Sequence, residues 1–194
     1  MTSRVLSTWF GLGILVLAAF ASESAAQVAN GIEYRVLATS RTSTMEKELN
    51  AAADAGFRFQ SVMGGDTAIG GSEVVIVMSR DNAKGRYAYR LLATARTSTM
   101  EKEIQQAAAA GYHYRGQTVF DTAFGGDEVV VILERDDEGQ PQAFEYRLVA
   151  TSKTSTLEKE LAEVGAAGYE VVGMTVSKTA LGGSELVAIA RKPR

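Results

Sequence analysis

The sequence predicts an α+β protein in which three tandem βαββ repeats pack as one pseudo-threefold domain, with the helices outside and mixed sheets facing inward. Three observations lead to this prediction. A Tyr-Arg pair recurs three times, a Gly-Gly pair follows each at a matching distance, and a strand pattern precedes a helix pattern in every copy. The repeats span residues 32–81, 87–136 and 144–192, and they open with Tyr34-Arg35, Tyr89-Arg90 and Tyr146-Arg147.

The first element of each repeat is a strand, which we expect over residues 33–39 in the first copy. Tyr34, Val36 and Ala38 alternate with the residues of an opposite face, and this is the period of a strand.

A helix is expected next. Ser43 and Glu46 have the spacing of a capping box, in which the two side chains satisfy free N–H groups at the start of a helix. Met45 and Leu49 begin an apolar stripe, and Gly56 suits the left-handed residue that ends a helix.

Two strands close the repeat, over residues 57–69 and 73–78, and Gly70-Gly71 suits the tight turn of a hairpin between them. Residues 74–78 and 129–133 are apolar at consecutive positions, which predicts strands that are buried on both faces. Since one helix covers one face of a sheet, we expect neighbouring repeats to cover the other. Three separate units on linkers are the alternative.

The composition excludes several classes of protein. The chain has 194 residues, no cysteine, one histidine and a formal net charge of −3. These values exclude disulfide scaffolds, cysteine-based metal sites and thiol nucleophiles, and they disfavour nucleic-acid binding. We predict no catalytic, cofactor-binding or metal-binding residue. The only histidine, His113, corresponds to Arg58 and Glu170 in the other copies, so we expect it to face solvent.

Residues 1–26 have the layout of a secretory signal peptide. Arg4 precedes an apolar run over residues 10–20, and Ser24-Ala25-Ala26 forms a small-x-small cleavage site before Gln27. A membrane anchor is the alternative, although the run is shorter than a spanning helix. We therefore expect a bacterial protein that is periplasmic or secreted and does not span the membrane after the signal is removed.

Three segments of the third repeat carry a family resemblance: Glu-Tyr-Arg-Leu-Val at 145–149, Leu-Glu-Lys-Glu-Leu at 157–161 and Ala-Gly-Tyr-Glu-Val-Val at 167–172. The repeat resembles the bacterial domain-of-unknown-function family numbered 4177. The resemblance implies a strand-helix-strand-strand fold, and it implies no activity because none is established for the family. That family often has Trp where this chain has Phe57, Tyr112 and Tyr169.

The loop before each helix is the best-preserved part of the three copies. Free helix N–H groups, hydroxyls and a basic side chain would meet there, which is the chemistry of an anion site. The candidate residues for binding an anion or a partner are Arg41, Thr42, Ser43, Thr44, Lys47, Arg96, Thr97, Ser98, Thr99, Lys102, Lys153, Thr154, Ser155, Thr156 and Lys159.

This loop also has a purely structural interpretation. The hydroxyls would only cap the helices, and the three lysines would form salt bridges to a neighbouring repeat. The loop cations would pair with acidic residues of the Gly-Gly turns, as Arg41 with Glu73, Arg96 with Glu128 and Lys153 with Glu185.

These observations favour an exported, non-enzymatic binding or assembly protein that contacts an anionic small molecule, a polymer or a partner protein through the repeated rim. Two alternatives remain open. One is an enzyme that uses carboxylates and lysine at a cleft between repeats. The other is a structural protein that self-associates through the apolar strands at 74–78 and 129–133.

Overall fold

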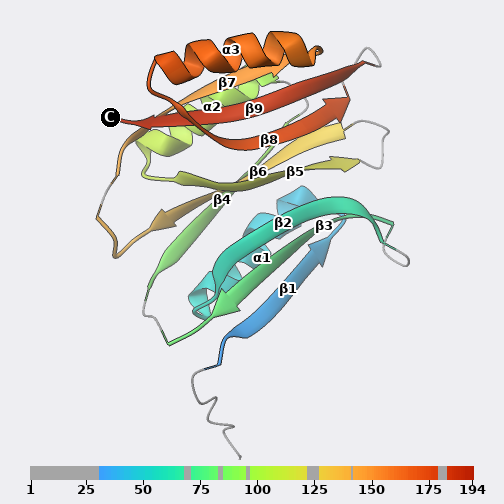
Figure 1. Cartoon of the computed structure of the whole chain (residues 1–194). Helices are drawn as coiled ribbons and strands as arrows, with labels where there is room; N and C mark the ends of the chain where they lie inside the picture. The colour runs from blue at the N-terminus through green and yellow to red at the C-terminus, as the bar shows by residue number, and fades with distance from the viewer. Residues whose placement is uncertain are drawn as a thin grey trace, which may run out of the picture.

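The computed structural model describes residues 31–67, 71–82, 85–94, 97–121, 127–140, 142–178 and 183–194. The signal peptide expected at residues 1–26 lies outside this range. Within it, no helix is both long and apolar enough to cross a membrane. The helices and strands follow one order three times, strand-helix-strand-strand (Figure 1).

The first unit contains β1 (Glu33–Thr39), α1 (Thr42–Asp54), β2 (Arg58–Thr67) and β3 (Gly71–Arg80). The second contains β4 (Tyr87–Thr94), α2 (Thr97–Ala109), β5 (His113–Asp121) and β6 (Asp127–Asp136). The third contains β7 (Phe144–Thr151), α3 (Thr154–Ala166), β8 (Glu170–Lys178) and β9 (Ser184–Pro193). The protein is therefore α+β.

Each unit forms its own three-stranded sheet, with the last strand in the middle: β1-β3-β2, β4-β6-β5 and β7-β9-β8. All neighbouring strands are antiparallel. The expectation of mixed sheets was wrong, because the hairpin strand inserts between the two strands that the helix connects. The first two strands of a unit thus run in the same direction without pairing.

Several local expectations are confirmed. Met45 and Leu49 are fully buried beneath α1. The backbone of Gly56 has φ +85°, and Gly111 and Gly168 have φ +84° and +83°. These are left-handed conformations that glycine adopts without a steric penalty, which is why each helix ends there. Gly71 likewise has φ +70° at the hairpin turn.

The capping box was wrong. The helix α1 begins two residues earlier than expected, with Arg41 rather than Ser43 as its N-cap and no side-chain cap, and α3 begins in the same way after Lys153. The backbone carbonyl of Arg41 accepts hydrogen bonds from Thr44 N–H and Met45 N–H. Because the capping box does not form, the carboxylate of Glu46 is available for another contact.

The Arg of each Tyr-Arg pair stacks on an aromatic ring of its own unit. Arg35 lies 4.1 Å from the Phe57 ring centroid, and Arg80 lies 4.6 Å from the same centroid. Tyr112 and Tyr169 are flanked in the same way by Arg90 and Arg135 and by Arg147 and Lys192. Each ring thus holds the first and last strands of its unit by cation–π contacts.

The three units stack in series (Figure 1). The helix α1 packs on β4 and β2 packs on β5, and the second and third units repeat this pairing through α2 with β7 and β5 with β8. The predicted pseudo-threefold packing is not confirmed. The helices α1 and α2 lie between successive sheets rather than outside them, and α3 covers the far end of the stack.

The hydrophobic cores are shared between units, which is inconsistent with three separate beads. One core joins Met45 and Leu49 of α1 to Tyr89 and Ile132 of the second sheet. The next joins Ile104 of α2 to residues of the third unit. The middle strand β6 is therefore buried on both faces across 129–133, as expected.

The first unit departs from that expectation. On β3, Val74, Ile76 and Met78 are buried, whereas Val75 and Val77 on the opposite face are only half-buried. No unit precedes the first one to cover this face in the described part of the chain. The burial of 74–78 on both faces was therefore predicted wrongly.

This difference gives a matched test. Val130 of β6 is fully buried, and Val75 is its counterpart on β3. Val130→Ala should cost about 2–3 kcal/mol of unfolding free energy, because it removes methyl groups and leaves a cavity between two units. Val75→Ala should cost less than about 1 kcal/mol. Urea unfolding of dilute protein measures both, and equal costs would contradict a serial stack with one open face.

Candidate functional site

The residues of the predicted rim lie at the start of each helix, and in the first unit the strand pairing shows what lies beside them. Thr39 and Val74 are paired, as are Thr67 and Gly71, so the helix start and the hairpin turn share one end of the sheet. The hydroxyl oxygen of Thr39 accepts a hydrogen bond from Arg41 N–H at 3.2 Å. In the third unit Thr151 accepts one from Lys153 N–H at 3.4 Å. The strand-end threonine therefore orders this loop.

The rim residues lie mostly at the surface. Arg41, Ser43, Lys153, Thr154 and Ser155 are exposed, whereas Thr42, Thr44 and Thr156 are half-buried. In the second unit Thr99 is exposed, Arg96 lies outside the described residues, and the side chains of Thr97 and Ser98 also lie outside the description.

The structural interpretation of the rim cations is not supported. Among the residues that the structure describes, Arg41 does not pair with Glu73, nor Lys153 with Glu185. Lys47, Lys102 and Lys159 are exposed and form no ion pair in that same part of the chain. An anion-binding role for the rim stays a prediction.

The preserved glutamate after each loop connects one unit to the next. Glu46 Oε2 accepts a hydrogen bond from Leu91 N–H of β4 at 2.9 Å, and Glu101 Oε2 accepts one from Leu148 N–H of β7 at 2.9 Å. Both strands lie at sheet edges, where N–H groups face away from the sheet. The glutamate thus satisfies an edge donor of the following unit.

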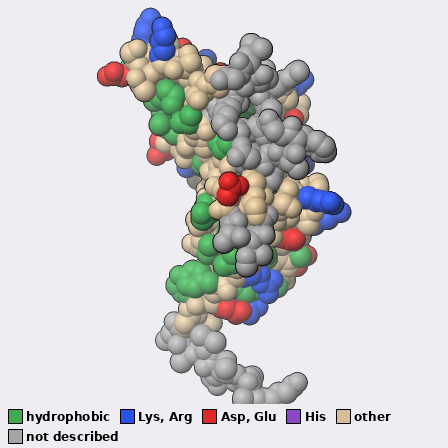
Figure 2. All heavy atoms as spheres, turned by 90° about the vertical axis from the view of Figure 1, so that its right-hand side faces the viewer, with side chains coloured by type: hydrophobic (Ala, Val, Ile, Leu, Met, Phe, Trp, Pro, Cys, Tyr) green, Lys and Arg blue, Asp and Glu red, His purple; other side chains and the backbone are tan. Residues whose placement is uncertain are grey.

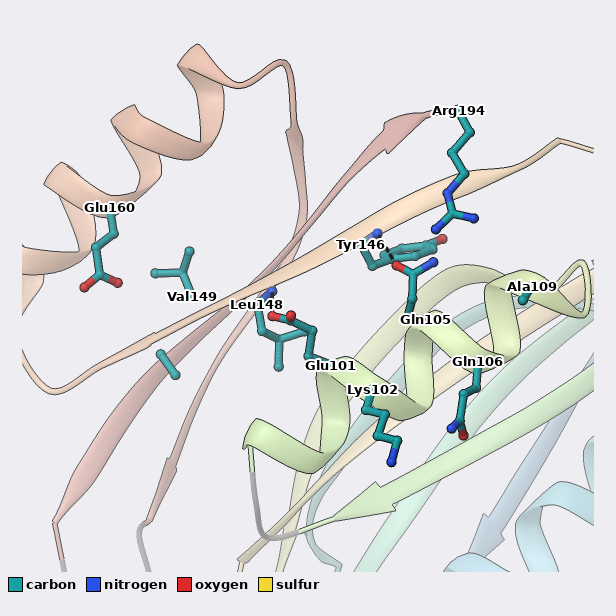
Figure 3. A pocket seen from close by; sticks show the side chains of 11 residues that line it. Glu101, Lys102, Gln105, Gln106, Ala109, Tyr146, Leu148, Val149, Glu160 and Arg194 are labelled. Atoms are coloured by element: carbon teal, nitrogen blue, oxygen red, sulfur yellow. Dashed lines mark hydrogen bonds between the residues drawn. The ribbon is translucent and has the colours of Figure 1, made fainter.

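An amide one turn along the helix completes the connection. Asn50 Oδ1 accepts from Tyr89 N–H, and Asn50 Nδ2 donates to Tyr89 O, both at 2.9 Å. At the corresponding place Gln105 Oε1 accepts from Tyr146 N–H at 2.9 Å. Figure 3 shows Glu101 and Gln105 extending from α2 toward β7.

The Tyr of each Tyr-Arg pair connects the same two units in the opposite direction. Tyr89 Oη accepts a hydrogen bond from Phe59 N–H at 2.8 Å, and Tyr146 Oη accepts one from Tyr114 N–H at 2.9 Å. Burial, together with the nearby carboxylate of Glu134, raises the pKa of Tyr89. Burial also raises the pKa of Tyr146. The hydroxyls of Tyr89 and Tyr146 therefore act as buried structural contacts between units.

Glu134 is the buried charge of the first junction. Its carboxylate accepts Tyr89 O–H at 2.8 Å and pairs with Arg58 at 2.8 Å and with Arg115 at 3.6 Å. The hydrogen bond to Glu134 raises the pKa of Arg58. The counterparts of Glu134 are Ser79 and Arg191, so this ionic cluster belongs to one junction alone.

His113 is half-buried, so its expected solvent-facing position was wrong. The imidazole packs edge-on against Phe144 of the third unit, with 5.0 Å between ring centroids. Burial first, and then the positive charge of Arg191, lower its pKa. Its Nδ1 is buried without a hydrogen-bond partner.

Grooves lie along both junctions in the described part of the chain. One, of about 850 Å³, lies beside α2 and β7 and is bordered by Lys102, Glu160 and Arg194 (Figure 3). The other, of about 740 Å³, is lined by Arg58, His113, Glu134 and Arg191, among others. Within the described residues no group of three or more His, Cys, Asp or Glu side chains could hold a metal ion.

The exposed large apolar side chains lie at the two ends of the stack. In the described part of the chain they are Ile32, Tyr34, Val36 and Met63 of the first unit and Val171, Met174 and Val176 of the third. We name the first set, with Val75 and Val77 of the same sheet face, the head face, and the second set the tail face. Figure 2 shows apolar side chains at the lower end, which the first unit forms.

Comparison with known proteins finds no match to this chain among family models, curated proteins or solved structures. The resemblance to family 4177 stays a prediction from its sequence motifs.

The connection between units was not predicted from the sequence. One signal could have found it. Polar residues occupy the same position in the first two helices, as Asn50 and Gln105, whereas the last helix has Ala162. A polar position that is lost in the last copy indicates a contact to the following unit.

The buried ion pair gives a second test. Glu134→Ala should cost about 1–3 kcal/mol of unfolding free energy, because the half-exposed Arg58 and the buried Tyr89 hydroxyl lose their partner. Glu33→Ala removes an exposed ion pair to Arg80 at 2.5 Å and should cost less than about 1 kcal/mol. Urea unfolding compares the two, and a larger loss for Glu33→Ala would refute the assignment.

His113 gives a third test. Because its pKa is lowered in the folded protein, the unfolded chain binds a proton more readily as the pH falls through about 6.5. This contribution to stability is present above that pH and is lost below it. Wild type should therefore lose more stability than His113→Gln between pH 7.5 and 5.5. Equal losses in urea unfolding would show that the histidine is not linked to folding.

Proposed function

We propose that this protein is an exported, non-enzymatic assembly protein whose three stacked units join to another protein chain through the ends of the stack. The observation that carries the proposal is the location of the exposed large apolar side chains on the head and tail faces. Contiguous apolar surface at a water-facing position is a feature of interaction sites.

The first and third units support this function because their outer faces carry exposed apolar side chains. In proteins of stacked repeats, each unit contacts its neighbours, and polar outer faces on the terminal repeats keep the molecule soluble. Here the head face presents Tyr34 at 64% and Val36 at 63% exposure. An exposed apolar face of this kind is stabilised when a partner covers it.

The position of these residues also supports the proposal. Tyr34 corresponds to Tyr89 and Tyr146, whose exposed fractions are 2% and 4%. Val36 corresponds to Leu91 and Leu148, which are packed against the cores of the two junctions. The head face therefore has the residues of a buried junction, and in the described part of the chain these residues are exposed.

The proposal is tested in the exported fraction of the source cell. We expect the wild-type protein to run there in complexes larger than a single chain, and Val36→Glu to run as a single chain, because a carboxylate on the head face opposes burial. The control is Ala51→Glu, which makes the same change at an exposed position on α1. Gel filtration with immunodetection provides the measurement. Single chains for the wild type would contradict the proposal.

A further inference from the structure

We infer that the partner is a second copy of this chain, and that the tail face of one copy stacks on the head face of the next as the first unit stacks on the second. This inference rests on the proposed function. The two faces are the two halves of a junction that the chain already forms twice.

The tail face has the side chains that would approach the next unit. Phe59 and Val62 of β2 lie against the second unit, beside Gly116. Tyr114 and Gln117 of β5 lie against the third unit, beside Gly173. The corresponding residues of β8 are Val171 and Met174, and among the described residues they remain 43% and 55% exposed.

The sizes of the opposing residues match across the third, intermolecular junction. A Cβ on Gly116 would lie 3.0 Å from Phe59 Cζ, and one on Gly173 would overlap the Tyr114 hydroxyl, so an aromatic ring needs glycine opposite. At the ends, Val171 replaces the aromatic residue and Ser61 replaces the glycine. The smaller side chain on the tail leaves room for the larger one on the head.

The chemistry of a second pair of positions matches as well. Inside the chain, Gln117 Nε2 donates to Thr175 Oγ1 at 3.0 Å, which joins polar residues of β5 and β8. The corresponding positions at the ends are Met174 on the tail and Met63 on the head, both exposed. The polar pair of the second internal junction is thus replaced by an apolar pair at the ends.

The polar contacts of the junction are present in part. Glu158 occupies the position of Glu46 and Glu101, and it is exposed on α3, where it can accept the N–H of Val36 from another copy. The hydroxyl of Tyr34 can accept the N–H of Val171. Ala162 stands where Asn50 and Gln105 bind the next strand, so the intermolecular junction has one connection fewer and is weaker than the internal ones.

The geometry of such an assembly is head-to-tail. The two faces differ, so each copy uses both, and the assembly grows into a filament or closes into a ring. Apolar burial provides the attraction, and Glu158 with the edge N–H groups fixes the register.

The inference is tested with purified protein, as the cell processes it, by analytical ultracentrifugation over a range of concentrations. The mass of the wild type should rise with concentration. Val36→Glu disables the head and Met174→Glu disables the tail, and each variant alone should be monomeric. Mixed together they retain one working head and one working tail, so they should form a one-to-one dimer and nothing larger. Ala51→Glu should assemble like the wild type, and thermal unfolding checks that every variant folds.

A gain of affinity provides a second measurement. Ala162→Gln restores the amide found at Gln105, so it should lower the Kd of association roughly 2- to 10-fold. The control Ala166→Gln, one turn along α3, should leave the Kd unchanged.

Three results would overturn the inference. The first is a monomeric wild type at every concentration, and the second is a mixture of the two variants that forms no dimer. The third is loss of association with Val36→Glu but not with Met174→Glu, which would show head-to-head pairing.

If purified protein is monomeric while complexes in the exported fraction still depend on Val36, the proposed function stands with a different partner. If those complexes are absent too, both proposals fail.

Discussion

The structure depends on one constraint: each unit has a single helix, and a three-stranded sheet has two faces to cover. The helices α1 and α2 meet this constraint by serving two sheets, since each packs under its own sheet and over the next. A unit of about 50 residues would have a marginal core alone. The stack therefore gains stability because neighbouring units share a layer of helix. The faces that still need to be covered are those at the two ends of the stack.

The contacts between units serve this arrangement in a specific way. The first strand of the second and third units lies at a sheet edge, and the preceding helix supplies an oxygen acceptor to two of its N–H groups, as Glu46 and Asn50 do for Leu91 and Tyr89. The tyrosine of that strand returns a hydroxyl to the N–H of Phe59. These directional contacts fix the register that apolar packing leaves open.

Much of the fold could be predicted from the sequence, because local rules determine it. These rules act within a few residues: they are the alternation along residues 33–39, the stripe of Met45 and Leu49, and the glycines at 56 and 71.

The arrangement of units could not be predicted. The apolar run at 129–133 indicates burial on both faces, but it does not say whether the units close into a ring of three or stack in series. Similarly, Glu46 fits a capping box by spacing, and only the position of β4 shows its partner. The position of the candidate rim could be predicted from the order of the strands and the helix in each unit. The head and tail faces could be recognised only by comparing exposed residues with their buried counterparts in the other units.

The most direct test of this account is amide hydrogen exchange at three corresponding positions, Val36, Leu91 and Leu148, measured by NMR as a function of protein concentration. Leu91 and Leu148 donate to glutamates of the preceding helix, so their N–H groups should be protected at every concentration. The N–H of Val36 should exchange rapidly in dilute protein and become protected as the concentration rises. Strong protection of Val36 at the lowest concentration, or rapid exchange at the highest, would contradict a stack whose open head is covered by the tail of another copy.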